Sequence, residues 1–153
     1  MISSYSFSQS TSQSSNASIF LLSPISITSS TGDLDFGEIL LTGSSFTEII
    51  APGGGKLFVV KGMAGRSVSI FFNPIVIDNV AWIATFGGTA DNISFTPDVE
   101  LDDGTNINSG DFQILPDVAG LGELNLWVGG SIFIAAPQAH GDYTGLFTVT
   151  VSY

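Results

Sequence analysis

An acidic stretch offers the clearest candidate for a cation site. The segment DVELDDGTNINSGD, residues 98–111, sets carboxylates at alternate positions and then enters a loop of Asn and Gly. Ca²⁺ prefers hard oxygen ligands of this kind, from carboxylates and loop carbonyls. The spacing is not that of an EF-hand, because Gly104 comes one residue too late and no closing Glu follows. A solvated acidic loop is the alternative. The candidate ligands are Asp98, Glu100, Asp102, Asp103 and Asp111.

Residues suited to catalysis are few. The one histidine, His140 in PQAHGDYTG, would need an activated serine and a carboxylate to form a triad, and no G-x-S-x-G elbow is present. GGGK, residues 53–56, lacks the spacing of a phosphate-binding loop and indicates a hairpin turn. Paired carboxylates of a glycosidase would need a cleft that the sequence does not show. Cysteine is absent, which excludes thiolate chemistry. We therefore expect no enzyme and no cofactor.

Two tryptophans suggest a different class of function. Trp82 and Trp127 lie in the apolar runs VAWIATF and LNLWVGG. Exposed indole rings could stack on sugars, with the acidic loop holding calcium, as in a monomeric lectin-like adhesion domain. Burial in the core is the alternative for both rings, and the apolar runs favour it.

The composition restricts the partners. Fourteen acidic residues against three basic ones give a net charge of −11, so nucleic acid and anionic lipid are poor partners. Hydrophobic residues make up 44% and charged residues 11%, where about 25% charged is usual. The mean hydropathy is +0.42, yet no apolar run approaches the roughly 20 residues that span a bilayer. The surplus apolar surface therefore belongs in a core or an interface.

The sequence also favours an extracellular location. The start MISSYSFSQS has neither a cationic nor an apolar signal-peptide region. The protein is therefore either cytosolic or secreted with its signal peptide already removed, and the composition leads us to expect the second. Few lysines, many small polar residues and two N-x-[ST] sequons at Asn16 and Asn92 agree with this expectation.

Short apolar stretches rich in Val, Ile, Phe and Thr recur between turn residues, and helical periodicity is nearly absent. Eighteen glycines and six prolines suit tight turns. This pattern predicts an all-β fold, a single antiparallel β-sandwich of immunoglobulin-like, pilin-like Greek-key type. The predicted strands are 17–28, 34–41, 46–50, 56–61, 67–72, 75–86, 93–96, 112–115, 124–128, 131–135 and 143–153.

The segment 143–153 carries the clearest strand pattern. Aromatic and aliphatic residues alternate with threonine and serine, as expected of a strand with one buried face. Leu146 is the one misfit, and we interpret it as an interface residue.

The first fifteen residues also alternate but are mostly serine. A disordered tail is one interpretation. The other is a strand that adds to an exposed sheet edge of another subunit through main-chain hydrogen bonds. We accordingly expect an N-terminal extension over 1–15, a donor strand, and a sandwich domain over 16–153, with 16–28 leading into the donor's own sandwich. The predicted subunit-interface residues are Ile2, Tyr5, Phe7, Gln9, Thr11 and Gln13.

The segments SPISITSSTGDLDFGEIL (23–40) and LWVGGSIFIAAPQAHGDYTGLFTVTVSY (126–153) carry a family resemblance. The chain resembles the DUF4402 family, and its closing G-x-Y-x-G…V-x-V-x-Y is similar to the ends of spore-coat-U-like and fimbrial subunit domains. The resemblance implies a secreted immunoglobulin-like domain at the cell surface, of a type in which many members assemble by donor-strand exchange. Unlike chaperone–usher pilins, this chain has no cysteine pair. The matching positions are Pro24, Ile25, Ile27, Leu34, Phe36, Gly37, Val128, Gly129, Gly130, Gln138, Gly141, Tyr143, Gly145, Phe147, Val149, Val151 and Tyr153.

Taken together, these features predict a structural subunit of an extracellular filament or pilus. Copies would polymerise head-to-tail by donating the N-terminal segment to a neighbour, because a heterologous contact of this kind propagates. A monomeric cell-surface adhesion or carbohydrate-binding sandwich is the alternative.

Overall fold

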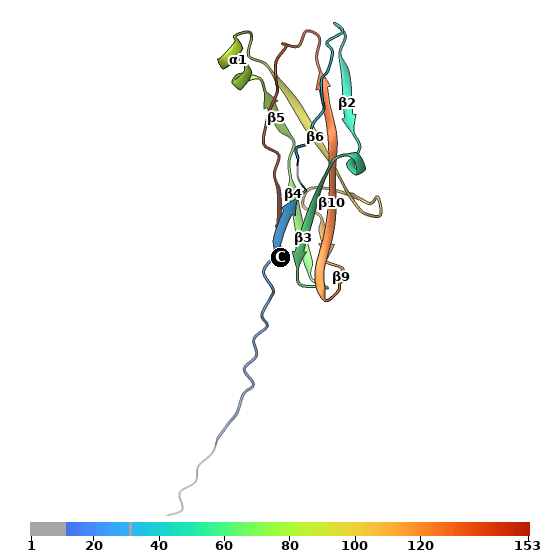
Figure 1. Cartoon of the computed structure of the whole chain (residues 1–153). Helices are drawn as coiled ribbons and strands as arrows, with labels where there is room; N and C mark the ends of the chain where they lie inside the picture. The colour runs from blue at the N-terminus through green and yellow to red at the C-terminus, as the bar shows by residue number, and fades with distance from the viewer. Residues whose placement is uncertain (1–11, 31) are drawn as a thin grey trace, which may run out of the picture.

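The computed structural model describes residues 12–30 and 32–153. They form two antiparallel sheets, packed face to face, with an extended N-terminal segment that leaves the sandwich at its lower end (Figure 1). This arrangement confirms the predicted all-β sandwich.

The larger sheet is built around β10 (Leu121–Ile134), a strand of 14 residues. The strand order is β1 (Ser26–Ser29), β3 (Lys56–Gly62), β10, β6 (Asn92–Leu101) and β5 (Ile75–Asp78). Three short strands extend it: β2 (Phe46–Ile50) and β9 (Asp117–Val118) pair with β10, and β7 (Asn106–Ile107) pairs with β6. All of these pairings are antiparallel.

One edge of β10 pairs with two different strands. Val128 lies opposite Lys56 of β3, whereas Gly130 lies opposite Ile50 of β2. The 3₁₀ turn η1 (Pro52–Gly54) joins these strands and crosses over Gly129. A Cβ on Gly129 would lie 2.2 Å from the carbonyl oxygen of Ile50, so only glycine permits this crossing. The GGGK stretch is therefore a connection between strands.

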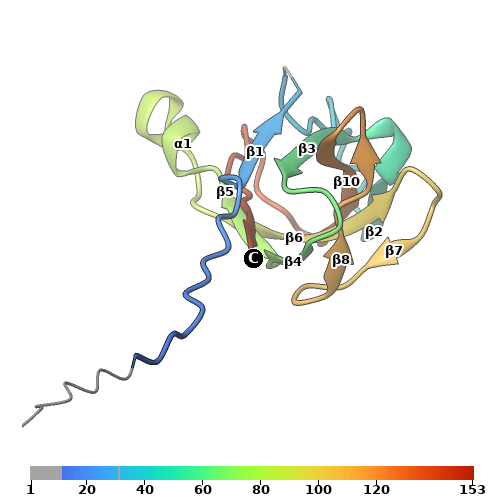
Figure 2. The ribbon, with the colours of Figure 1, turned by 90° about the horizontal axis from the view of Figure 1, so that it is seen from below.

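The smaller sheet has three strands, in the order β11 (Val149–Ser152), β4 (Ser67–Phe72) and β8 (Phe112–Ile114). In the view from below, its strands β4 and β8 lie beside one another (Figure 2). Between the two sheets lies the main apolar core, whose buried members include Val60, Val68, Ile70, Leu115 and Leu126.

The upper part of the larger sheet carries a second apolar cluster of Ile93, Phe95, Ile132 and Ile134. No strand of the smaller sheet lies over it. Its cover consists of two irregular segments, residues 33–41 and 140–147, which contribute Leu34, Phe36, Ile39, Tyr143 and Phe147.

Two of the predicted strands are shorter than their sequence patterns suggested. In 17–28 only Ser26–Ser29 is a strand, since the chain first packs on the core at Ile25. In 143–153 only Val149–Ser152 is a strand. Its partner β4 ends at Phe72, and the chain then crosses at Asn73 and Pro74 to the larger sheet. The residues before Val149 therefore have no strand of the smaller sheet to pair with.

The predicted strand 34–41 is not regular structure. Gly37 has a φ of 72°, which takes it into the left-handed region, and its N–H donates to the Asp35 carboxylate at 2.8 Å. Before the turn, Phe36 packs inward on the cluster, and after it Ile39 does. Because these two residues are three apart, the alternation of a strand is broken.

The predicted strand 75–86 was wrong in its second half, where Val80–Phe86 forms helix α1. Asp78 accepts from the Val80 N–H at 3.0 Å and so caps the helix start. Trp82 and Phe86, four residues apart, pack with their ring centroids 4.3 Å apart. The predicted strands 124–128 and 131–135 are parts of β10, and 93–96 is part of the longer β6.

Residues 12–22 form a segment, here called the tail, that has no regular structure and lies outside both sheets (Figure 1). Ser23 is held to the domain through its backbone: its carbonyl accepts from the Tyr153 hydroxyl at 2.9 Å. The tail carries four consecutive exposed apolar residues, Ile19, Phe20, Leu21 and Leu22, with exposed fractions of 84%, 60%, 76% and 47%.

Candidate functional site

A groove with a volume of about 1410 Å³ lies over the upper half of the larger sheet. This exceeds the roughly 300–1000 Å³ of a typical small-molecule pocket. Its floor consists of apolar side chains from β5, β6 and β10. They are Ile75, Ile77, Ile93, Phe95, Val128, Ile132 and Ile134.

Two rims border the groove, the first being residues 33–41 and the second residues 140–147. Phe36 of the first rim and Phe147 of the second both pack edge-on against Phe95 on the floor. The centroid distances are 6.1 Å and 5.6 Å, with interplanar angles of 73° and 79°. Such T-shaped contacts match the ring quadrupoles, so each rim is fastened to the sheet through the same central ring.

The backbones of both rims lack sheet partners. Within residues 12–30 and 32–153, no backbone–backbone hydrogen bond involves residues 33–41 or 145–147. The second rim is tied to the sheet at Thr144, whose N–H and C=O both bond Asp78 of β5. The groove is therefore an apolar floor between two irregular segments, in which most N–H and C=O groups of residues 33–41 and 145–147 have no backbone partner.

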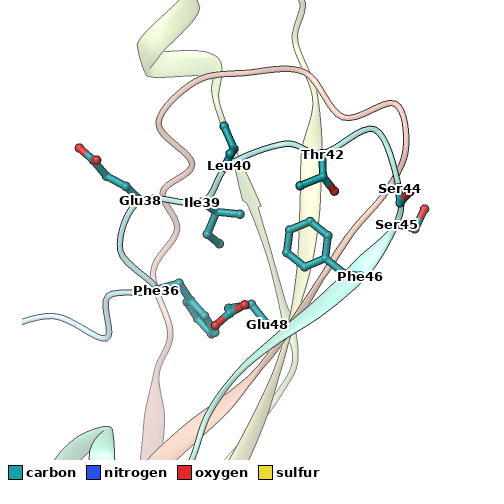
Figure 3. Close-up of a pocket in the computed structure, with 9 residues that line it drawn as sticks. All are labelled: Phe36, Glu38, Ile39, Leu40, Thr42, Ser44, Ser45, Phe46 and Glu48. Carbon is teal, nitrogen blue, oxygen red and sulfur yellow. The ribbon is translucent and has the colours of Figure 1, made fainter.

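A smaller hollow of about 410 Å³ lies on the other side of the first rim, between that rim and β2. Ile39 and Phe46 face one another across it, whereas the carboxylate of Glu38 turns away (Figure 3). The first rim thus has open space on two sides and is held by the packing of Leu34, Phe36 and Ile39 on the upper cluster.

The lower part of the second rim is fixed by a hydrogen-bond network. Asp91 accepts from the N–H of Ala139 at 2.9 Å and from the N–H of Asn92 at 2.8 Å. These two bonds, the first from Ala139, lower the pKa of the Asp91 carboxyl below its usual 3.8. The hydroxyl of Tyr143 donates to the Ala139 carbonyl at 2.7 Å, and burial raises the pKa of Tyr143.

The acidic stretch forms local hydrogen bonds. Asp98 bonds Asn106, Asp103 caps the turn at Thr105, and Asp111 accepts from Asn108. Bonds from the side chain and backbone of Thr105 lower the pKa of Asp103. Glu100 lies on β6 and is half-buried. In the described part of the chain, no three acidic or histidine side chains gather as a metal site, so the five candidates are not brought together.

The two tryptophans have different surroundings. The Trp127 indole donates to Asp102 at 2.7 Å, and Asn125 bonds the other oxygen of the same carboxylate at 3.0 Å. Trp82 is half-buried against Phe86 and borders one end of the groove. His140 is exposed in the second rim, and its carbonyl accepts from the buried Asn79 amide at 3.4 Å.

Some of the remaining predicted site residues lie in the described part of the chain and some do not. Ile2, Tyr5, Phe7, Gln9 and Thr11 lie outside the described residues, and Gln13 is exposed in the tail. The sequons Asn16 and Asn92 are both exposed. Leu146, predicted to mark an interface, is 86% exposed on the second rim. The sequence analysis did not predict the groove. The available signal was Leu146, the one residue that does not fit the strand pattern of 143–153.

A comparison with protein families gives one match. The model of a domain of unknown function, DUF4402, matches residues 25–153. The chain belongs to the DUF4402 family. No curated protein matches it. The matched region of this DUF4402 chain begins where the sandwich begins, at Ile25, so the groove lies within the family domain and the tail precedes it. No helix in the described residues is both long and apolar enough to cross a membrane.

Proposed function

We propose that this DUF4402 chain is a secreted structural subunit of an extracellular filament or pilus, which polymerises head-to-tail by donating its N-terminal segment to a neighbouring subunit. The observation that carries the proposal is the combination of an exposed apolar tail with a sandwich whose upper cluster is covered by two irregular segments instead of a strand. The four apolar residues at 19–22 lie in water, while the floor of the groove lacks a covering strand.

Burial of the exposed apolar residues of the tail and of the rims supplies the driving force. Apolar surface removed from water contributes about 25 cal/mol per Å², and sheet edges with free N–H and C=O groups are templates for added strands. A tail on one subunit and a groove on the next form a heterologous contact, which repeats into a filament. The net charge of −11 would keep finished filaments apart.

Negative-stain electron microscopy of the purified chain tests the proposal, beside a variant that lacks residues 1–22. The deletion leaves the whole of the matched region 25–153, and circular dichroism would verify that the variant folds. We expect filaments from the full chain and monomers from the variant. If the full chain remains monomeric at high concentration, the filament proposal is wrong, and titration with sugars would test the adhesion alternative.

A further inference from the structure

We infer that the groove is the acceptor site, and that its occupant is residues 17–22 of a second copy of this chain. The inference rests on the proposed function and deepens it by naming both sides of the subunit contact. It also places the donor contact closer to the domain than the stretch 2–15 predicted from sequence.

The groove has the form of a missing strand position. The two rims run on either side of an apolar floor, and neither has a backbone partner over residues 33–41 or 145–147 within the described chain. A strand laid between them would bond to both rims, over a cluster that the side chains of the rims already bury. A free amide or carbonyl that becomes buried must find such a partner.

The tail fits this position in length and polarity. Residues 17–22 form a stretch of six, which spans about 20 Å when extended. This is no longer than either rim, since residues 33–41 and 140–147 number nine and eight. Alternation places Ala17, Ile19 and Leu21 on one face, toward the floor. These are small and aliphatic side chains that suit an apolar surface of isoleucine and phenylalanine.

The other face of the same strand has a counterpart on the rims. Phe20 and Leu22 would point outward, level with Leu40 of the first rim and Leu146 of the second. Both leucines border the groove and are more than four-fifths exposed, at 83% and 86%. Cross-strand apolar pairs stabilise neighbouring strands, so the added strand would account for the exposure of these two large apolar side chains on the rims.

Charge also favours this occupant. The rims carry Asp33, Asp35, Glu38 and Asp142, and an acidic segment would be repelled. The first 32 residues contain no charged side chain, so the tail can enter without like-charge repulsion or the cost of burying an ion.

The position of the tail on its own subunit favours a second copy as the acceptor. Tyr153 holds Ser23 at the end of the sandwich where β3 and β4 meet, and the Arg66 guanidinium lies 4.3 Å from the Phe20 ring centroid. From there the tail runs away from the sandwich, whereas the groove lies over its upper half (Figure 1). A tail at one end and a groove toward the other is the arrangement of a head-to-tail repeat.

The first experiment replaces the inward face of the tail in the full chain, with the double variant Ile19→Ser/Leu21→Ser. The matched control is Ile49→Ser/Leu121→Ser, which changes two exposed aliphatic residues outside the groove. We expect the tail variant to lose filaments under the microscope at an unchanged unfolding midpoint, and the control to keep them. Filaments from the tail variant, or their loss from both variants, would overturn the assignment of residues 17–22.

The second experiment identifies the acceptor by cross-linking. The chain has no cysteine, so Leu21→Cys/Ile75→Cys introduces one thiol on the tail and one on the groove floor. We expect a ladder of covalent oligomers on oxidation and a single monomer band after reduction. The control Leu21→Cys/Ile49→Cys, with the second thiol on exposed β2, should give no ladder. A fast-migrating oxidised monomer would show that the tail occupies its own groove, and no cross-link at all would also overturn the inference.

The two proposals can fail separately. If the unmodified chain forms no filaments, the proposed function fails. If it forms filaments that survive Ile19→Ser/Leu21→Ser, assembly stands and the assignment of the tail to the groove is wrong.

Discussion

The hydroxyl of Tyr153 donates to the carbonyl of Ser23 at 2.9 Å and accepts from the N–H of Met63 at 2.8 Å. One side chain therefore ties β11 to the end of β3 and to the start of the N-terminal segment. The point where the tail leaves the sandwich is thus fixed by residues that are distant in sequence.

Removal of this hydroxyl should weaken the sandwich slightly. For Tyr153→Phe we expect a loss of about 0.5–1.5 kcal/mol, since two hydrogen bonds disappear at an exposed edge. That corresponds to a fall in Tm of about 2–5 °C for a domain of this size. The amide of Met63 should also exchange faster with solvent. Thr150→Val, at an exposed position of the same strand, is the control; an equal effect there would contradict a specific role for the hydroxyl.

A methyl group at Gly129 should be far more damaging than one at Gly53. The added Cβ would lie 2.2 Å from the Ile50 carbonyl oxygen and 2.6 Å from the nitrogen of Pro52, both backbone atoms that cannot rotate away. We expect Gly129→Ala to cost about 1–3 kcal/mol or more in urea unfolding. Gly53→Ala, with no atom within 4 Å of its Cβ, should change the midpoint little. Equal midpoints would contradict the close crossing of η1 over β10.

The bonds of Asp91 predict a dependence of stability on pH. Because the folded-state pKa lies below the usual 3.8, this carboxylate contributes stability above that value and loses it as the pH falls through the folded pKa. The difference in Tm between the wild-type chain and Asp91→Asn should therefore be constant from about pH 7 to about pH 5 and shrink toward about pH 2. Thermal unfolding across that range measures it. A difference that grows on acidification would refute the assignment.

Calcium should have little effect on the folded chain. The carboxylate of Asp102 is already engaged by Trp127 and Asn125, and the candidate ligands do not gather. A site of the affinity of extracellular modules, with Kd of about 0.1–1 mM, would gain about 1.4 kcal/mol or more at about 10 mM Ca²⁺. We expect no rise in Tm and no change in Trp127 fluorescence at that concentration. A clear rise with Ca²⁺, absent with Mg²⁺, would restore the acidic stretch as a cation site.

The sheet architecture could be predicted from sequence because alternation and turn residues act locally. The strands 46–50, 56–61 and 67–72 were confirmed almost to the residue, and the family resemblance was confirmed over residues 25–153. Helix α1 was missed because its apolar run resembles a buried strand. The i, i+4 spacing of Trp82 and Phe86 was the available signal.

The groove could not be predicted in the same way. The pattern of 143–153 is that of a strand throughout, but whether its first half finds a partner depends on where β4 leaves the sheet. That exit is set by Asn73 and Pro74, some seventy residues earlier in the chain. A sequence pattern states that a segment is suited to pairing, and only the tertiary arrangement decides whether a neighbour is present.

In the proposed filament, the contact of Phe36 and Phe147 with the single ring of Phe95 would affect the rate of assembly. An incoming strand that moves one rim would disturb the ring on which the other rim rests, so the two walls would open together. Such coupling favours a concerted insertion over a residue-by-residue one. A donor strand that has entered only halfway would break both aromatic contacts before its own contacts form. Subunit addition would then be slow to begin and slow to reverse, and a finished filament would persist long after free subunits are diluted away.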